Sequence, residues 1–288
     1  MASYRYSTVD VFTAKPLLGN ALAVVHDANG LTDAVMQRFT RWTNLSETTF
    51  LLPPTDPAAD YRVRIFFPGG ELPFAGHPTL GSCHSWLAAG GQPRDGDQIV
   101  QQCGVGLVRV RRDGTRLAFA APPLKRSGAV DDATLDSIAR SLRIERRAIR
   151  DSQWVSNGPG WVAVMLGSRA ELLALQPDLA NLEPHDIGVV APLPPKVGVV
   201  APLPSGDEAS FEVRAFIGGG GPFEDPVTGS LQAGLAMWLI GSGRAPERYV
   251  AIQGTALGRD GRVYVEKRGP DIWVGGDCVT LVEGTVEL

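Results

Sequence analysis

Two segments of this chain, about half a chain length apart, have nearly the same sequence. Residues 77–82 read His-Pro-Thr-Leu-Gly-Ser and residues 225–230 read Asp-Pro-Val-Thr-Gly-Ser, so the proline, the glycine and the serine each recur after 148 positions. An apolar, helix-like stretch follows each segment. A chain of 288 residues is long enough for two ordinary domains. A repeat of this size therefore predicts a duplicated domain rather than a solenoid.

The apolar pattern predicts the same architecture for both halves, namely strands wrapped around one buried helix. Helices are expected over residues 78–89 and 226–240, and the segment Leu231–Ile240 has almost no polar face. A helix that is apolar all round is buried all round. We expect an α/β (α+β) protein of two pseudo-symmetric domains, residues 1–122 and 123–288, whose last strand is able to return to the first half.

Composition and charge exclude several classes of partner. The formal net charge is −4 and the isoelectric point is near 5.6, which argues against nucleic acid and anionic membranes as partners. No apolar run reaches the 18 residues of a membrane span. The N-terminus has no apolar signal core, so a cytoplasmic location is expected. The densest basic run, Arg143–Arg150, is interpreted as a solvated helix face.

The cysteines and histidines do not have the spacing of a metal site. Cys83, Cys103 and Cys278 are odd in number and scattered, which is typical of free thiols in a reducing compartment. His77 and His84 would lie about 10 Å apart along one helix, too far to bind one ion together. We predict no metal.

The two repeated segments resemble helix starts that are suited to binding an anion. Proline is favoured at the first helical position, which predicts His77 and Asp225 as helix caps and residues 78–81 and 226–229 as first turns. Free backbone N–H groups at such a start bind carboxylate or phosphate. Asp225 is also a good structural cap, whereas capping does not explain His77.

Two further residues are candidates for chemistry. Glu47 enters an otherwise neutral strand; it lies either at an exposed strand end or in a cleft, where apolar surroundings would raise its pKa towards the range useful for proton transfer. Ser230 lies in a first helical turn, where serine is common. It lacks the Gly-x-Ser-x-Gly elbow that would favour a hydrolase.

A second, local repeat carries no evident chemistry. Residues Gly188–Pro194 and Gly198–Pro204 both read Gly-Val-Val-Ala-Pro-Leu-Pro. One copy is expected to form a strand and the other a loop.

With these residues in view, the chain resembles the PhzF-like family of phenazine-biosynthesis isomerases, which share the diaminopimelate epimerase fold. The resemblance covers essentially the whole chain and implies two pseudo-symmetric domains, a site in the cleft between them and a homodimer. It also implies a reaction without metal or organic cofactor. The matching segments are Asp10–Phe12, Gly19–Asn20, Ser46–Thr48, Glu71–Thr79, Glu224–Ser230, Gln253–Gly254 and Trp273–Gly276.

The resemblance also assigns roles to single residues. Glu47 matches the family's proton-shuttling glutamate, and His77, Asp225 and Ser230 match residues that hold the substrate and assist. Related epimerases carry a cysteine at each helix start, but here those positions hold no cysteine, which argues against racemisation by two thiols. The residues expected to bind substrate are Asn20, Gly76, Thr79, Thr228, Gly229 and Ser230.

We therefore expect a cofactor-independent isomerase that moves a proton within a small metabolite bearing a carboxylate or amino group. Three alternatives remain open from the sequence. They are a non-catalytic metabolite-binding protein, an epimerase and a hydrolase that uses Ser230.

Overall fold

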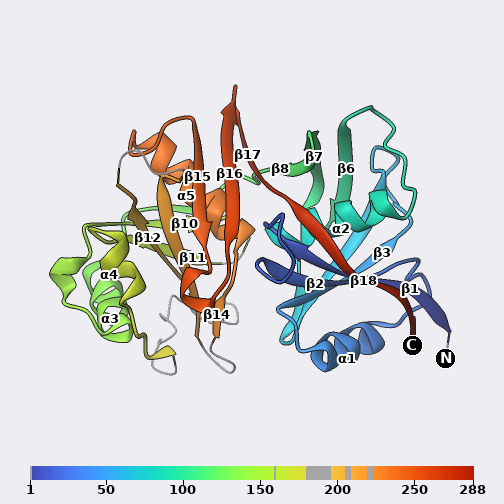
Figure 1. Ribbon diagram of the computed structural model, residues 1–288, viewed down its shortest axis with the longest axis horizontal. Coiled ribbons are helices and arrows are strands. Elements are labelled where there is room, and N and C mark those ends of the chain that lie inside the picture. Colours follow the sequence, from blue (N-terminus) through green and yellow to red (C-terminus); the bar gives the residue numbers. More distant parts are fainter. Residues whose placement is uncertain (1, 159, 180–195, 205–208, 219–222) are drawn as a thin grey trace. The chain divides into compact units, whose positions relative to one another are not determined.

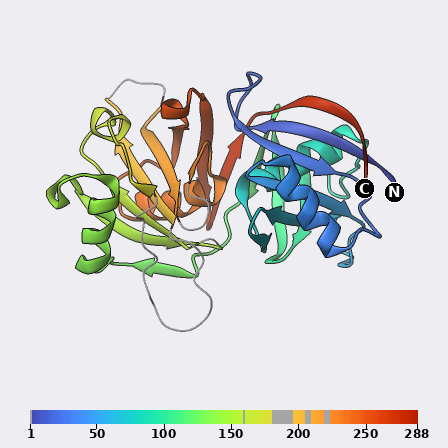
Figure 2. The ribbon, with the colours of Figure 1, turned by 90° about the horizontal axis from the view of Figure 1, so that it is seen from below.

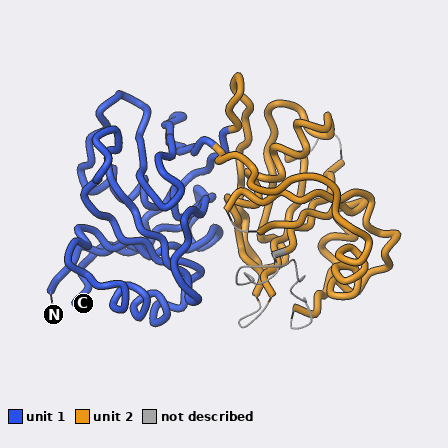
Figure 3. The backbone as a smooth tube through the Cα atoms, turned by 180° about the vertical axis from the view of Figure 1, so that it is seen from behind, with its two compact units in different colours: residues 1–120, 273–288 blue, residues 121–272 orange. Residues whose placement is uncertain are grey.

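The computed structural model describes residues 2–158, 160–179, 196–204, 209–218 and 223–288. The chain divides into two compact units (Figure 3). Unit 1 comprises Met1–Ala120 and Trp273–Leu288, and unit 2 comprises Ala121–Ile272. Compared with the predicted halves, the C-terminal strands thus belong to the first unit.

Unit 1 is built mainly from strands. Its β1 pairs with β2 and with the C-terminal strand β18, and β2 runs parallel to β3. The two chain ends lie side by side (Figure 2), where the Ala2 N–H donates to the Leu288 carbonyl at 2.8 Å. The elements are β1 (Ser3–Val11), β2 (Asn20–Val25), α1 (Asp33–Thr43), β3 (Glu47–Leu52), β4 (Tyr61–Phe67), β5 (Gly70–Leu72), α2 (Gly76–Ala88), β6 (Gln98–Cys103), β7 (Gly106–Asp113), β8 (Arg116–Ala120), β17 (Asp271–Gly276) and β18 (Cys278–Glu287).

The helix α2 lies at the centre of unit 1. It contacts β1, β2, β3, β6, β8 and β18 (Figure 1), and all of its first eight residues are buried. The amphipathic α1 packs differently, because only one face carries apolar side chains: Met36 and Phe39 join Phe50 and Phe66 in a core cluster. The predicted buried helix of this half is thus present.

Unit 2 has a second central helix, α5, whose residues are almost all buried and which contacts β10, β11 and β16. Its amphipathic helix α3 covers a separate core cluster with β10, β11 and β12. The elements are β9 (Arg126–Gly128), α3 (Asp132–Leu142), η1 (Arg146–Ala148), β10 (Asp151–Ser156), β11 (Trp161–Met165), α4 (Arg169–Leu173), β12 (Lys196–Pro202), β13 (Phe211–Ile217), β14 (Phe223–Asp225), α5 (Gly229–Gly241), β15 (Arg248–Gln253), η3 (Thr255–Leu257) and β16 (Gly261–Arg268).

The strand ladders of the two units follow the same plan. In unit 1 the order β1, β2, β3, β4, β6, β7 has parallel pairs at β2–β3 and β4–β6. In unit 2 the order β10, β11, β12, β13, β15, β16 has parallel pairs at β11–β12 and β13–β15. A short strand, β5 or β14, pairs with β4 or β13 and leads into the central helix. The predicted duplication is therefore present in the backbone.

The central helices also correspond, but not as the near-repeat of sequence suggests. Each has 13 residues; α2 begins at Gly76 and α5 at Gly229, 153 positions later. The sixth residue of each helix, Gly81 or Gly234, approaches a strand so closely that a Cβ would lie 2.6 Å from the Leu22 side chain in one unit and 2.3 Å from the Val155 carbonyl in the other. The helices therefore match with an offset of 153, whereas the near-repeat has an offset of 148.

This offset corrects the predicted helix starts. The N-cap residues are Ala75 and Thr228, so His77 and Asp225 are not the caps. Pro78 is the third residue of α2, whereas Pro226 precedes α5, because β14 and the turn after it occupy this segment. The prediction of first turns at 78–81 and 226–229 is thus wrong in register.

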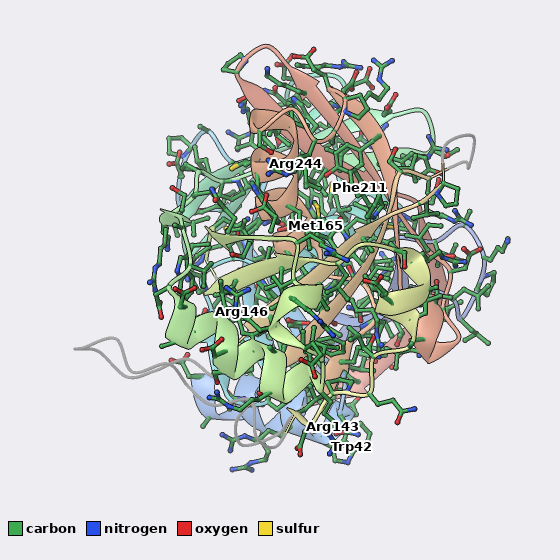
Figure 4. All side chains as sticks on the ribbon, turned by 90° about the vertical axis from the view of Figure 1, so that its left-hand side faces the viewer. Trp42, Arg143, Arg146, Met165, Phe211 and Arg244 are labelled. Atoms are coloured by element: carbon green, nitrogen blue, oxygen red, sulfur yellow. The ribbon has the colours of Figure 1, made fainter. Side chains whose placement is uncertain are left out.

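Other sequence-based predictions have mixed outcomes. The second copy of the local repeat begins inside β12, and the first copy lies outside the described residues. Arg143 and Arg146 are solvated as expected (Figure 4), yet they lie at the end of α3 and in the short η1 rather than on one helix face. The cysteines are free thiols. Among the described residues, no helix has the length and apolarity needed to cross a bilayer.

Candidate functional site

Glu47, His77 and Asn20 come together in unit 1. Glu47 begins β3 and His77 is the second residue of α2; the Glu47 Oε2 atom lies 3.4 Å from the His77 Nε2 atom. On the other side of the ring, the Asn20 Nδ2 atom lies 3.3 Å from His77 Nδ1. The imidazole is thus held between an amide and a carboxyl group.

The surroundings of this trio keep the imidazole neutral. The His77 side chain is 3% exposed and that of Glu47 is 16% exposed, so Glu47 is not the exposed strand end that the sequence left open. Burial lowers the pKa of His77 to about 3, because a charged imidazolium loses its hydration inside the protein. A neutral histidine has one N–H donor and one acceptor nitrogen.

The first turn of α2 is fixed by a buried glutamine. Thr79 donates its hydroxyl to the Ala75 carbonyl at 2.9 Å and accepts a hydrogen bond from Gln101 Nε2 at 3.0 Å. The Tyr61 hydroxyl donates to Gln101 Oε1 at 2.9 Å. Gly76, the first residue of the helix, is buried beside them. In the structure Thr79 therefore bonds to protein groups and stabilises the helix start.

A corresponding glutamine holds the start of α5 in unit 2. Gln253 is fully buried; its Nε2 donates to the Asp225 carbonyl at 3.1 Å and to Thr228 Oγ1 at 2.9 Å. Its Oε1 accepts from the Thr228 N–H at 3.1 Å and from Gln232 Nε2 at 2.9 Å. Thr228 in turn donates its hydroxyl to Asp225 Oδ2 at 2.6 Å. The Asp225 carboxyl group thus has a defined position beside the N-cap residue.

An ion pair next to Asp225 fixes β14, the strand that ends at Asp225. Arg214 makes two bonds to Glu224, of 2.9 and 2.7 Å, and both side chains are largely buried. Its Nη1 donates to the carbonyls of Leu172 and Leu175, at the end of α4. The planar guanidinium suits this bidentate contact. β14 is therefore tied to both β13 and α4.

Ser230 is the second residue of α5 and is bonded to donors. Its Oγ accepts a hydrogen bond from Trp161 Nε1 at 3.1 Å, and its carbonyl accepts one from Asn157 Nδ2 at 2.8 Å. A nucleophilic serine needs a base to accept its proton, and an indole N–H only donates. This geometry does not favour the hydrolase alternative.

The two central helices differ from the others in how they begin. The N-cap side chains of Thr32, Asp131 and Ser168 accept a bond from a backbone N–H of α1, α3 and α4, respectively. The N-cap residues of α2 and α5, Ala75 and Thr228, make no such side-chain bond. Their first-turn N–H groups are therefore not satisfied by a cap.

A comparison with known families identifies the chain. A family model described as "Phenazine biosynthesis-like protein" matches residues 9–284. The chain belongs to this family.

Individual relatives agree with this membership. The chain is 32% identical to a trans-2,3-dihydro-3-hydroxyanthranilate isomerase of Pseudomonas aeruginosa, over 99% of this chain and 100% of the relative. It is also 32% identical to a protein of Schizosaccharomyces pombe named Antisense-enhancing sequence 1, over 99% of both chains. The solved structure of a predicted epimerase from Pseudomonas aeruginosa matches with 28% identity and a TM-score of 0.79, over 98% of this chain and 99% of that one.

These findings confirm the predicted family and fold class, and they confirm that this phenazine biosynthesis-like protein is an isomerase. The roles of single residues stay predictions. Unit 1 brings together Asn20, Glu47, Gly76, His77 and Thr79, and unit 2 brings together Asp225, Thr228, Gly229 and Ser230.

Sequence reasoning missed the residues that support these groups. Gln253 lies in a segment that the resemblance included, yet its hydrogen bonds to the start of α5 were not anticipated. Gln101 and Trp161 had no signal in the sequence, because their partners are 22 and 69 positions away in the chain.

The cysteine nearest to a helix start is not a reactive thiol. Cys83 is fully buried inside α2, and burial raises its pKa to about 12. The thiolate is the nucleophilic form. A buried, protonated Cys83 is not suited to racemisation by two thiols, the reaction that the sequence argued against.

Proposed function

We propose that this phenazine biosynthesis-like protein transfers a proton within a small metabolite that carries a carboxylate, using Glu47 as the base and the acid. The contact of 3.4 Å between Glu47 Oε2 and His77 Nε2 carries the proposal. A carboxyl group beside a buried, neutral imidazole in an isomerase is suited to acid–base chemistry at a carbon atom.

The steps require one group that both takes and returns a proton. Glu47 takes a proton from an activated carbon, and the electron pair of that C–H bond stays on the substrate. Glu47 then returns the proton to a second carbon, where that electron pair forms the new C–H bond. Asp225 and Ser230, each held by hydrogen bonds in unit 2, stay candidate substrate-binding residues from the sequence.

The uncapped helix starts supply the binding of the carboxylate. The N–H groups at the start of α2, the helix that carries His77, have no side-chain cap, and the positive end of a helix dipole favours an anion. The start of α5 has the same property within its own unit. The same groups would stabilise negative charge as it develops during proton transfer. Gly76 and Gly229, the first helical residues, have no side chain to keep a ligand from this backbone.

A relative suggests the first compound to test. Because the relative from Pseudomonas aeruginosa is named for trans-2,3-dihydro-3-hydroxyanthranilate, this compound is the first candidate substrate, and a set of small cyclic amino acids follows. A ligand present at about 100 times its dissociation constant stabilises the fold by about 2.7 kcal/mol, which a thermal-shift screen detects.

The decisive experiment is turnover in deuterated water by the wild type and by Glu47→Gln. We expect the wild type to isomerise the substrate and Glu47→Gln to lose activity by about 10²-fold or more. The exposed Glu145 provides a matched control, since Glu145→Gln removes the same charge on the surface.

Each outcome distinguishes the candidate functions. Full activity of Glu47→Gln would exclude Glu47 as the proton-transferring residue. Tight binding without turnover, unchanged in Glu47→Gln, would instead favour the metabolite-binding alternative. A cytoplasmic location and a homodimer stay predictions from the sequence.

A further inference from the structure

The second residue of each central helix is held by a donor from the first residue of a strand. In unit 1, Asn20 begins β2 and its Nδ2 lies 3.3 Å from His77 Nδ1. In unit 2, Trp161 begins β11 and its Nε1 lies 3.1 Å from Ser230 Oγ. In both units, therefore, the first residue of a strand contacts the second residue of the central helix through a side-chain nitrogen.

The atom that Asn20 presents to the ring decides which way this contact is made. An asparagine amide can present either its nitrogen or its oxygen to a partner, whereas an indole can only donate. In the structure, Asn20 likewise presents its nitrogen to the ring. We infer that Asn20 donates to His77 Nδ1 and so fixes the ring as the tautomer protonated at Nε2, which makes Asn20 a positioning residue. This inference rests on the proposed function.

The backbone around Asn20 is rigid, so its amide has a defined place. The Asp10 carboxylate accepts a hydrogen bond from the Gly19 N–H at 3.2 Å. A Cβ at Gly19 would lie only 2.2 Å from the Val11 carbonyl, so only glycine fits there. Asn20 pairs with Val11 in the β1–β2 ladder and is 2% exposed.

The tautomer decides what His77 does for Glu47. With its proton at Nε2, the ring presents an N–H to Glu47 Oε2 at 3.4 Å, a distance at which the structure makes no direct hydrogen bond. The partial positive charge of this N–H favours the carboxylate that is ready to accept a proton. The same nitrogen has no lone pair to accept that proton once Glu47 holds it. The proton taken from the substrate carbon therefore stays on Glu47, where it forms the O–H bond, until Glu47 returns it to the second carbon.

The direct test is the ¹⁵N NMR spectrum of the wild-type protein labelled with ¹⁵N-histidine. Long-range ¹H–¹⁵N correlations distinguish a protonated ring nitrogen from an unprotonated one, and the spectrum of His77→Gln identifies the His77 signals among the four histidines. We expect protonated Nε2 and unprotonated Nδ1. A protonated Nδ1 in the wild type would overturn the inference, whatever the activity.

A change at Asn20 tests the cause. Asn20→Asp replaces the donor by a carboxylate of the same shape, which accepts a hydrogen bond, so we expect Nδ1 to become protonated and kcat to fall by about 10²-fold or more. Asn44→Asp, the same change at the exposed end of α1, should leave the His77 signals unchanged. An unchanged tautomer in folded Asn20→Asp would show that Asn20 does not set it.

The two proposals fail in different ways. If Glu47→Gln stays active, the proposed function fails, while the spectrum of the wild type still reports the tautomer. If Glu47→Gln is inactive but Nδ1 is protonated in the wild type, the inference about Asn20 fails and the proposed function stands.

Discussion

The Nε2 atom of His77 lies 3.4 Å from Oε2 of Glu47, although the two residues belong to a helix and a strand that are 30 positions apart in the chain. The Glu47 side chain reaches the ring from the start of β3, so the length of this side chain sets the distance between its carboxyl group and His77. Glu47→Asp withdraws this group by about one C–C bond. Because a misplacement of about 1 Å can cost about 10²-fold in rate, we expect kcat to fall by about that factor.

The measurement for Glu47→Asp is steady-state turnover together with a denaturation curve. The fold should be retained, since a carboxylate remains at the start of β3. A variant as active as the wild type would mean that the contact with His77 does not position the reacting group.

The neutral state of His77 predicts how stability changes with pH. Burial lowers the pKa of His77 from 6.5 to about 3 on folding. Between these pH values the unfolded chain binds a proton that the folded chain does not, so acid destabilises the fold by up to about 1.4 kcal/mol per pH unit for this group. This loss should be absent from His77→Gln.

Urea denaturation of the wild type and His77→Gln at several pH values between 7 and 4 measures this difference. Burial also lowers the pKa values of His26 and His84, but these residues are common to both proteins and cancel. Repeating the pair in the Glu47→Gln background removes the titration of the neighbouring carboxyl group. A constant difference between the two proteins across this range would contradict the prediction.

Gln253 makes four hydrogen bonds at the start of α5, and its replacement should be costly. Gln253→Leu leaves the Thr228 N–H and Gln232 Nε2 without their acceptor in a buried place. Buried unsatisfied groups cost about 1–3 kcal/mol each, so we expect a loss of about 3 kcal/mol in the free energy of unfolding. Chemical denaturation measures it, with the exposed Gln92→Leu as the control; equal stability of the two variants would refute this role.

Two glycines in α5 should respond to alanine in opposite directions. A Cβ at Gly234 would lie 2.3 Å from the Val155 carbonyl, whereas a Cβ at Gly241, in the last turn, meets no atom within 4 Å. We expect Gly234→Ala to destabilise the protein by about 1–3 kcal/mol through overpacking. Gly241→Ala should stabilise it by about 0.5–1 kcal/mol, because alanine loses less backbone entropy in a helix. Thermal melts of both variants test the sign.

Local patterns in the sequence were sufficient for much of the fold. The segment Leu231–Ile240, with almost no polar face, correctly indicated a buried helix, and Glu47–Leu52 was correctly expected as a strand. These elements follow from side-chain periodicity, which is a local property. The predictions of the helix starts were less accurate. A proline after an ionisable residue also fits a turn, and Pro226 lies in the turn that follows β14.

The hydrogen bonds that hold the starts of the central helices could not be predicted from local sequence patterns. The contact of Trp161 with Ser230 spans 69 positions, and that of Asn20 with His77 spans 57 positions. Nothing in a single sequence states which strand residue reaches which helical residue, because the register of distant strands around the helix decides it.

By itself the sequence determined that this chain is a duplicated α/β protein with one apolar helix in each half, and its motifs pointed to Glu47, His77 and Asp225. Only the tertiary structure decided which residues correspond. His77 matches Ser230, because each is the second residue of its central helix. The hydrogen-bond register of the strands, not the likeness of the two motifs, sets where each helix begins.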